Sequence, residues 1–600
     1  MSSRPRGIGL FLVLYASLLL IDSTAAFGQY FGRQKVQYEE FEWQVMETDH
    51  FDIHFYPEEQ AVTQDAARMS ERWYARLSRA FQHEFLKKPM IFYADHPDFQ
   101  QTNTTWSQLT EGTGGFTDAL RNRVVMPFTG SYFENDHVIG HELVHVFQYD
   151  LSTSAGGGGL QGMSRLPLWL IEGMAEYLSL GREDAHTAMW MRDAALRGEL
   201  PTIEQLTTDT RFFPYRYGQA LWAYVAGRYG DAAVTEVFRY ATRAGFEAAL
   251  QRVLGVTSGQ LSQDWITSIR ATYLPVLAGR QRPEDAGDPI LHDAEPGAMN
   301  LAPAVSPDGQ YVAFFGRREI FTIDLYIADA QTGEVVTQLT SPDRDEHFDA
   351  LSFIQSAGSW SPDGQKFAFI IFDDGDNQIA IVDIASRDIE RRFSVESVGA
   401  VQTVAWSPDG SRIAFSGMSG GLSDLYVLDL ASGSVRQLTN DRYANLHPAW
   451  SPDGGTLAFV TDAGTDMDEL IYGKMRIGLL DVASAQSRLL ELFPSGKHIN
   501  PQFSPDGRDL YFLADPHGFT DLYRVEIATN QIYQITNLAT GISGITALSP
   551  AMSVASSNGR VMFSVFENSG SNIYGLDAAR ARGQPVDRTS PQIARAAILP

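Results

Sequence analysis

The sequence predicts a multidomain protein in which an α+β domain is followed by an all-β six-bladed propeller. Three observations lead to this fold class. Residues 141–145 read His-Glu-Leu-Val-His within a helical pattern. From residue 306 onward the tetrapeptide Ser-Pro-Asp-Gly recurs at intervals of 44 to 55 residues. Between these regions, residues 280–296 are polar and contain proline, which is typical of a linker.

Length and composition limit the classes of function that this protein can have. The chain has 600 residues, which is too many for one hydrophobic core, so at least two domains are expected. It contains no cysteine, which excludes disulfides and thiolate metal sites. A formal net charge of −27 repels phosphate backbones and anionic lipid surfaces, so no nucleic acid partner is expected.

Residues 1–28 are expected to be a signal peptide. Arg4 and Arg6 precede an apolar stretch of 14 residues, 8–21, and the small residues Ala25 and Ala26 follow. This stretch is shorter than the roughly 20 residues that span a bilayer, although an uncleaved anchor is the alternative. No later stretch is apolar enough to cross a membrane, so we expect export to the periplasm, the cell envelope or the medium, with no transmembrane segment in the mature chain.

Residues 29–278 are expected to form the α+β domain. Residues 51–56 alternate between apolar and polar, as a half-buried strand does, whereas residues 61–85 have helical spacing. Two further strands are predicted at 89–93 and 123–128. An edge strand beside the helix that follows is a place where a peptide substrate could add itself by backbone pairing.

The helix after these strands carries the first group of candidate metal-binding and catalytic residues. It is expected to start from an N-cap at Asn135 or Asp136 and to run to residue 149. His141 and His145 then lie one turn apart on one face, with Glu142 beside them. Two imidazoles and an adjacent carboxylate in this spacing are typical of a zinc site that activates water.

A second helix, within residues 166–177, carries two carboxylates four residues apart. Glu172 lies 27 residues after His145 and could be the third protein ligand that a catalytic zinc needs. Glu176 shares its face and could accept a hydrogen bond from a ligating histidine. Two buried acids on an apolar helix would be costly without a cation. The alternative is a helix pair that binds no metal, and His137 is read as a capping or surface residue.

These motifs resemble the gluzincin branch of metallopeptidases, and within it the "peptidase MA-like" domains, whose helices read H-E-L-x-H and W-L-x-E-G-x-A-E-Y. The resemblance extends over roughly residues 41–274 and implies a zincin-like fold. It implies one Zn²⁺ held by His141, His145 and Glu172, with Glu142 as the catalytic base and Glu176 as an outer partner.

Residues 213–218 are similar to the P-Y-x-x-G segment of aminopeptidase-type gluzincins, which implies that the Tyr215 hydroxyl helps to hold the oxyanion, with Tyr217 as the second candidate. Those aminopeptidases also carry a G-x-M-E-N strand whose glutamate binds the substrate's free amine. The corresponding region here, residues 111–116, reads Glu-Gly-Thr-Gly-Gly-Phe, and no glutamate follows in the matching place. An endopeptidase is therefore expected rather than an aminopeptidase.

The second half of the chain is repetitive. Ser-Pro-Asp-Gly fits a type I turn, and each turn is followed by a short strand. The turns begin at Ser306, Ser361, Ser407, Ser451 and Ser504, with a decayed sixth copy expected at Ser549-Pro550. This period predicts six four-stranded blades over residues 298–582, after a linker at 279–297 and before a tail at 583–600.

The repeats resemble the PD40 (WD40-like) blades of TolB-like propellers, which implies a role in binding proteins. Taken together, the sequence predicts an exported zinc metallopeptidase that acts on peptides or proteins, with a propeller that binds substrates or a partner in the cell envelope. The alternative is a non-catalytic TolB-like binding module with a degenerate peptidase domain.

Overall fold

The computed structural model describes residues 35–600 except 36, 106, 108, 155, 157, 319–322, 341–349, 353 and 589–594. The expected signal peptide, residues 1–28, lies outside the described residues. Within the described ranges, every helix is too short or too polar to cross a bilayer.

The N-terminal region is built on a five-stranded sheet with the order β1-β2-β3-β5-β4. The strands are β1 (Gln44–Glu47), β2 (Phe51–Phe55), β3 (Lys88–Tyr93), β4 (Phe116–Asp118) and β5 (Arg123–Pro127). The three central strands are parallel, whereas β1 and β4 pair antiparallel at the edges. The edge strand next to β5 is therefore β4, which the sequence pattern did not predict.

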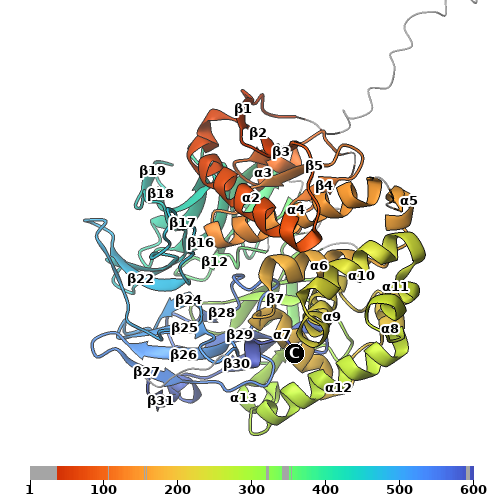
Figure 1. Cartoon of the computed structure of the whole chain (residues 1–600). Helices are drawn as coiled ribbons and strands as arrows, with labels where there is room; N and C mark the ends of the chain where they lie inside the picture. The colour runs from red at the N-terminus through yellow and green to blue at the C-terminus, as the bar shows by residue number, and fades with distance from the viewer. Residues whose placement is uncertain are drawn as a thin grey trace, which may run out of the picture.

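Helices cover this sheet and extend the region, as Figure 1 shows. Helices α2 and α4 lie against each other, and α6 packs on both α4 and α9. The helices are α2 (Gln60–Phe81), α3 (His96–Gln100), α4 (Tyr132–Thr153), α5 (Gly159–Met163), α6 (Leu168–Leu180), α7 (Ala185–Arg197), α8 (Ile203–Thr208), α9 (Pro214–Tyr229), α10 (Asp231–Ala244), α11 (Phe246–Val253), α12 (Ser258–Leu277) and α13 (Pro283–Ala286).

The predicted start of α4 was wrong. The helix begins at Tyr132, and its N-cap position is Ser131, four to five residues earlier than expected. The side chains of Asn135 and Asp136 do not cap it, because they bind other segments. Asn135 accepts a hydrogen bond from the Thr129 backbone at 2.8 Å, and Asp136 accepts one from the Trp73 indole at 2.9 Å.

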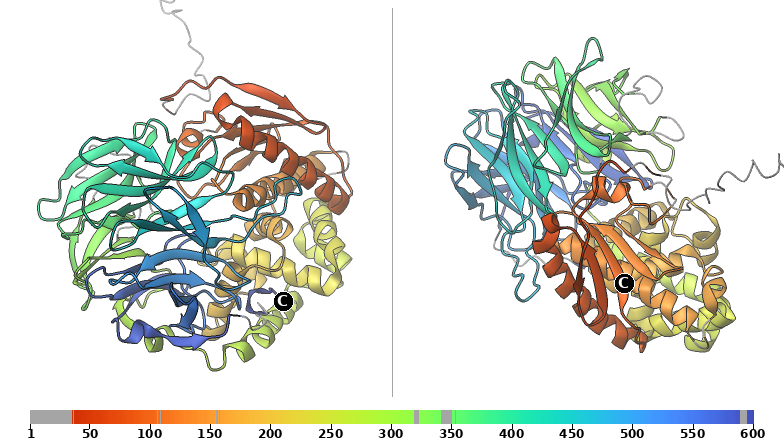
Figure 2. Two further views of the ribbon diagram at one scale, coloured as in Figure 1. Left: turned by 90° about the vertical axis from the view of Figure 1, so that its left-hand side faces the viewer. Right: turned by 90° about the horizontal axis from the view of Figure 1, so that it is seen from above.

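The C-terminal part is a six-bladed β-propeller (Figure 2). Blades one to three contain β7 (Asn300–Val305) to β10 (Val335–Gln338), β11 (Ala350–Leu351) to β15 (Ile389–Ser394), and β16 (Ala400–Trp406) to β19 (Val435–Gln437). Blades four to six contain β20 (Asn445–Trp450) to β23 (Ser487–Leu489), β24 (His498–Phe503) to β27 (Gln531–Gln534), and β28 (Met552–Val554) to β30 (Gly570–Leu576).

Two segments outside the predicted propeller add strands to it. β6 (Asp288–Leu291), inside the expected linker, pairs with β30 and becomes the fourth strand of blade six. β31 (Gln584–Val586), inside the expected tail, pairs with β27 of blade five. Because β6 precedes blade one in the sequence and completes blade six, the ring is closed by segments from both of its ends.

Each Ser-Pro-Asp-Gly turn joins the two innermost strands of a blade through the same hydrogen bonds. In blade one, the Ser306 hydroxyl donates to Asp308 at 2.6 Å, and the Asp308 carboxylate accepts from the Gln310 backbone at 3.0 Å. The predicted sixth copy at Ser549-Pro550 was misplaced, because these residues precede β28. The turn of blade six contains Asn558, which accepts from the Arg560 backbone at 3.0 Å as Asp308 does in blade one.

The helical region covers the end of the propeller opposite these turns. It contacts loops that join the second and third strands of the blades, and Gly130 forms a β-bridge with Leu422 in blade three. The Thr129 carbonyl accepts a hydrogen bond from Gln402 at 3.3 Å. The loop between β5 and α4 is therefore anchored on the propeller.

A buried aspartate in blade four leads to a prediction about pH. Asp462 is 1% exposed, and its Oδ1 accepts from the Ala444 backbone at 2.8 Å, whereas its buried Oδ2 has no partner among the described residues. Burial raises the pKa of Asp462 to about 6. Because the pKa is higher in the folded state than in the unfolded chain, ionisation destabilises the fold as the pH rises from about 4 through 6.

We therefore expect Asp462→Asn to gain stability relative to the unaltered chain as the pH rises from 4 to 8, by up to about 3 kcal/mol. Urea denaturation across this range measures the difference. Asp453→Asn is the matched control, because the hydrogen bond from Ser451 lowers the pKa of that exposed aspartate and its substitution should show no such gain. A stability difference for Asp462→Asn that does not change with pH would contradict the prediction.

Candidate metal centre

Three predicted ligand atoms converge between α4 and α6. His141 Nε2 and His145 Nε2 lie 3.2 Å apart, and Glu172 Oε2 lies 3.3 Å from the first and 3.2 Å from the second. In a tetrahedral zinc site with bonds of 2.0 to 2.1 Å, neighbouring ligand atoms are separated by about 3.3 Å. The three atoms therefore have the mutual spacing of one face of such a tetrahedron, and this donor set fits zinc.

Close helix packing brings Glu172 to the histidines. Gly173 follows Glu172 on α6 and faces Gly218 on α9, where a Cβ added to Gly173 would lie 2.3 Å from the Gly218 Cα. A side chain at either glycine would force these helices apart. Gly173 permits this close packing against α9. Glu172 and Glu176, four residues apart, lie on the face of α6 that meets α4.

Both histidine rings are held by a second hydrogen bond. His145 Nδ1 lies 2.8 Å from Gln148 Oε1, and His141 Nδ1 lies 3.2 Å from Glu176 Oε1. Such outer partners fix the orientation of a ring, so each Nε2 points into the cluster. Arg216 in turn donates to Glu176 Oε2 at 3.2 Å. The sequence predicted Glu176 in this position but missed Gln148, which lies three residues after His145 on the same helix face.

The carboxylates and imidazoles of the cluster shift each other's pKa values. Burial opposes ionisation of Glu172, but His145 and His141 lower the pKa of this carboxyl far below its usual range. Burial likewise opposes protonation of His141, but hydrogen bonds to Glu172 and Glu176 raise its pKa to about 10. The carboxylates therefore hold protons on the imidazoles, and a metal ion would compete with these protons for the same nitrogen atoms.

Glu142 faces the edge strand and is not one of the three converging ligands. The Thr117 hydroxyl of β4 donates to Glu142 Oε2 at 2.7 Å. Among the described residues Glu142 Oε1 has no hydrogen-bond partner, and it is the atom available to a water molecule. Sequence reasoning missed Thr117, because a single threonine on a short strand carries no recognisable pattern.

Tyr215 lies beside the cluster, and Tyr217 does not. The Tyr215 ring is nearly parallel to that of His141, with 6.0 Å between ring centroids. Burial and the nearby charge of Glu172 raise the pKa of Tyr215 well above its usual range, so its hydroxyl stays protonated. Tyr217 is 1% exposed and packs against Phe212 instead. Tyr149 also borders the cluster: burial, Glu172 and Glu142 raise its pKa to about 12.

His137 is neither a cap nor a surface residue, contrary to the prediction. It lies within α4 and is partly buried, with Nδ1 at 3.1 Å from the Ser179 hydroxyl and Nε2 at 3.6 Å from Glu176. Burial lowers its pKa to about 4. His137 therefore belongs to the hydrogen-bond network around Glu176.

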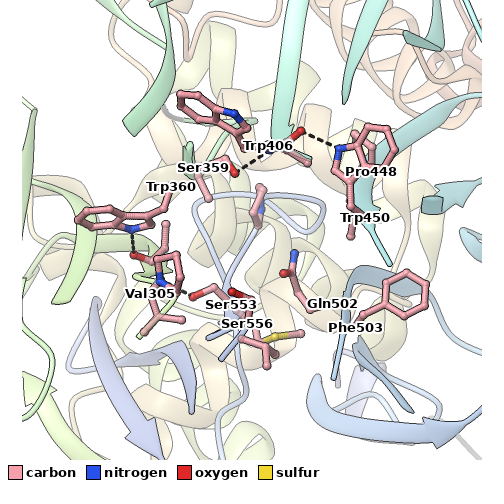
Figure 3. Close-up of a pocket in the computed structure, with 18 of the residues that line it drawn as sticks. Val305, Ser359, Trp360, Trp406, Pro448, Trp450, Gln502, Phe503, Ser553 and Ser556 are labelled. Atoms are coloured by element: carbon pink, nitrogen blue, oxygen red, sulfur yellow. Dashed lines mark hydrogen bonds between the residues drawn. The ribbon is translucent and has the colours of Figure 1, made fainter. Parts of the chain in front are cut away.

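The propeller contains a separate pocket of about 380 Å³ near its Ser-Pro-Asp-Gly turns (Figure 3). The described residues that line it include prolines, tryptophans and small polar residues, and none of them is an aspartate, glutamate, lysine or arginine. The Trp360 indole donates to the Ala304 carbonyl at 2.8 Å, and the Trp450 indole to Ala405 at 3.0 Å. These tryptophans join neighbouring blades.

Comparisons with known families match both parts of the chain. Residues 127–264 match the family "Peptidase of plants and bacteria", and residues 352–468 match the "TolB beta propeller domain". The first match contains all the residues of the metal centre described above except Thr117. It is a different family from the peptidase MA-like domains that the motifs resemble. The N-terminal region is thus similar to a family of peptidases, and the propeller to that of TolB.

Similar solved structures align with a little under half of the chain. TolB from Acinetobacter baumannii is 21% identical, covering 45% of this chain and 68% of its own, with a TM-score of 0.34. A putative TolB from Agrobacterium tumefaciens is 21% identical, covering 42% and 83%, with a TM-score of 0.32. Oligogalacturonate lyase from Vibrio parahaemolyticus is 13% identical, covering 48% and 92%, with a TM-score of 0.33. No curated protein matched the sequence.

Proposed function

We propose that this chain is an exported, zinc-dependent metallopeptidase of the gluzincin type that hydrolyses internal peptide bonds. The observation that carries this proposal is the convergence of His141 Nε2, His145 Nε2 and Glu172 Oε2 within 3.2 to 3.3 Å of one another. The match of residues 127–264 to a family of peptidases supports the same reaction class. The apolar stretch near the N-terminus supports export.

In this proposal His141, His145 and Glu172 would hold one zinc ion. When bound, zinc supplies a Lewis acid that polarises a carbonyl and lowers the pKa of water from 15.7 to about 7. Gln148 and Glu176 keep the imidazole rings oriented for this task.

Glu142 is the proposed general base and acid. Thr117 holds its Oε2 at 2.7 Å, which leaves Oε1 to accept the proton of the attacking water. The same carboxyl group then delivers that proton to the leaving amine. Tyr215, protonated at neutral pH, would donate a hydrogen bond to the oxyanion that forms on the substrate.

The environment of β4 supports an endopeptidase rather than an aminopeptidase. Asp118 is the only acidic residue of this strand, and its carboxylate binds Arg123 at 3.2 Å. Thr117 is hydrogen-bonded to Glu142. In the described part of this strand, no carboxylate is therefore free to hold the amino terminus of a substrate.

Metal analysis tests the proposal. We expect about one zinc per chain after dialysis of the unaltered protein, and zinc affinity should fall in Glu172→Gln by more than the roughly 10- to 100-fold that follows loss of an outer partner. Glu204→Gln, on the exposed face of α8, is the control and should keep its zinc. Incubation with a mixed peptide library, with and without chelator, should yield internal cuts that depend on the metal.

The second candidate function is binding of an envelope protein by the propeller, with the N-terminal region as an inactive scaffold. The uncharged pocket of about 380 Å³ and the match to the TolB propeller favour it. The same experiment separates the candidates: a chain that takes up no zinc and cuts no peptide, yet captures an envelope protein, would favour the binding module.

A further inference from the structure

A run of aromatic side chains extends from the metal centre to the propeller. Tyr215 stacks on Phe213 with 5.1 Å between ring centroids, Phe213 lies 5.8 Å from Trp190, and Trp190 lies 4.6 Å from Phe566. All of these distances fall in the range of aromatic pairs that attract each other. We call these four residues the aromatic wall.

The wall starts at the reacting centre and is partly open to solvent. Tyr215 lies parallel to His141 at 6.0 Å, so the first ring borders the proposed zinc ligands. Phe213, the next ring, is 43% exposed, whereas Trp190 is half-buried and Phe566 is 5% exposed. Phe213 directly precedes Pro214, the first residue of α9, which limits the movement of the backbone that carries it.

The propeller holds the far end of the wall in place. Phe566 lies near the end of β29 in blade six and supports Trp190 of α7. The loop after β29 is tied to the same helix, because the Asp193 carboxylate accepts hydrogen bonds from the backbones of Asn568 and Ser569, each at 3.1 Å. The position of Trp190, and through it that of Phe213, therefore depends on blade six.

The propeller also anchors the opposite side of the metal centre. Glu111, in the loop that leads to β4, accepts a hydrogen bond from the Ser352 hydroxyl at 2.8 Å and one from the Ile354 backbone at 3.1 Å. Both residues belong to blade two. The strand beside Glu142 and the wall beside Tyr215 are thus both fixed on the propeller.

We propose that the aromatic wall selects substrates with a large apolar or aromatic side chain next to the scissile bond, and that the propeller is a structural part of this specificity site. The inference rests on the proposed peptidase function. Phe213 is exposed beside Tyr215 and so offers apolar surface to a neighbouring side chain of the substrate. A phenylalanine in the substrate would bury far more apolar surface against it than an alanine would. Apolar contacts of this kind discriminate between substrates by about 10- to 200-fold.

The test compares two peptides that differ only in phenylalanine or alanine next to the cleaved bond. We expect the unaltered chain to show a higher kcat/KM for the phenylalanine peptide by about 10-fold or more, and Phe213→Ala to lose most of this preference. Zinc content should not change in Phe213→Ala, and its kcat/KM should fall more for the phenylalanine peptide than for the alanine peptide. Phe566→Leu should reduce the preference in the same direction, which would assign the effect to the propeller. Tyr240→Ala is the control, because Tyr240 is 41% exposed on α10, outside the wall.

A binding measurement provides a second readout that does not depend on turnover. Calorimetry with the Glu142→Gln chain should show tighter binding of the phenylalanine peptide, and the added substitution Phe213→Ala should remove the difference. Hydrolysis with unchanged selectivity in both Phe213→Ala and Phe566→Leu would overturn the aromatic wall alone. No hydrolysis and no zinc in the unaltered chain would overturn the proposed function and this inference with it.

Discussion

Replacing Glu142 with glutamine is expected to lower kcat for peptide hydrolysis by about 10²- to 10⁴-fold without loss of zinc. The substitution removes the atom that accepts a proton and changes little else. The Thr117 hydroxyl donates to Glu142 Oε2, and the amide oxygen of glutamine can accept the same hydrogen bond. The three converging ligand atoms belong to other residues, so the metal should stay in place.

The measurement pairs steady-state kinetics with metal analysis on the same preparation. Glu183→Gln is a suitable control, because this glutamate follows α6 at an exposed position and is not one of the cluster residues described above. Retained hydrolysis in Glu142→Gln would remove Glu142 from the role of general base. Loss of zinc together with activity would instead indicate that Glu142 is a ligand.

Much of the candidate site was predictable because helical spacing fixes local geometry. His141 and His145 must share a face once they lie four residues apart on one helix, and so must Glu172 and Glu176. That the two faces meet could be inferred from chemistry, since buried carboxylates on an apolar helix require positive partners. The structure brings Glu172 to both histidines and Glu176 to His141, as expected from this reasoning.

The residues that were missed come from contacts that leave no local signature. Thr117 reaches Glu142 only because β4 pairs antiparallel with β5, and Arg216 reaches Glu176 only because α9 crosses α6. Prediction of the fold from the sequence was limited in the same way. The Ser-Pro-Asp-Gly turns were recognisable because a tight turn restricts residue type. The strand β6 completes blade six by backbone hydrogen bonds, which depend little on the identity of the side chains.

The decayed turn of blade six illustrates how a motif can be lost while its geometry is kept. Asn558 accepts the backbone hydrogen bond that an aspartate accepts in the other blades, because both side chains present an oxygen at the same place. The sequence pattern selected Ser549-Pro550 instead, since these two residues match the motif by identity. Position relative to the strand, and not identity, decides which residues form the turn.

Replacing Arg192 with alanine is expected to destabilise the chain by about 3–5 kcal/mol, because it removes a buried cation that joins three segments. Arg192 lies on α7 and is 1% exposed. Its guanidinium donates to the carbonyls of Ala596, Thr540 and Gly518 at 2.7, 2.8 and 3.2 Å. It also lies over the Phe519 ring at 4.3 Å from the centroid.

The loss should be large because the three carbonyls would remain buried after the arginine is gone. Each unsatisfied acceptor costs about 1–3 kcal/mol, and the side chain also leaves a cavity. Arg192→Met fills part of that cavity but supplies no donor, so it should recover only a minor share of the stability. Arg270→Ala, at an exposed position of α12, is the matched control and should stay within about 0.5 kcal/mol of the unaltered chain.

Denaturation followed by two probes gives the sharpest test of what Arg192 does. The carbonyls that it binds belong to the propeller and to the C-terminal segment, whereas α7 belongs to the helical region. If the arginine couples these parts, its removal should separate one unfolding transition into two, with the helical region unfolding at lower denaturant than the propeller. A single transition at an unchanged midpoint would show that the remaining interface, including Asp193 and Gln402, is sufficient to hold the two parts together.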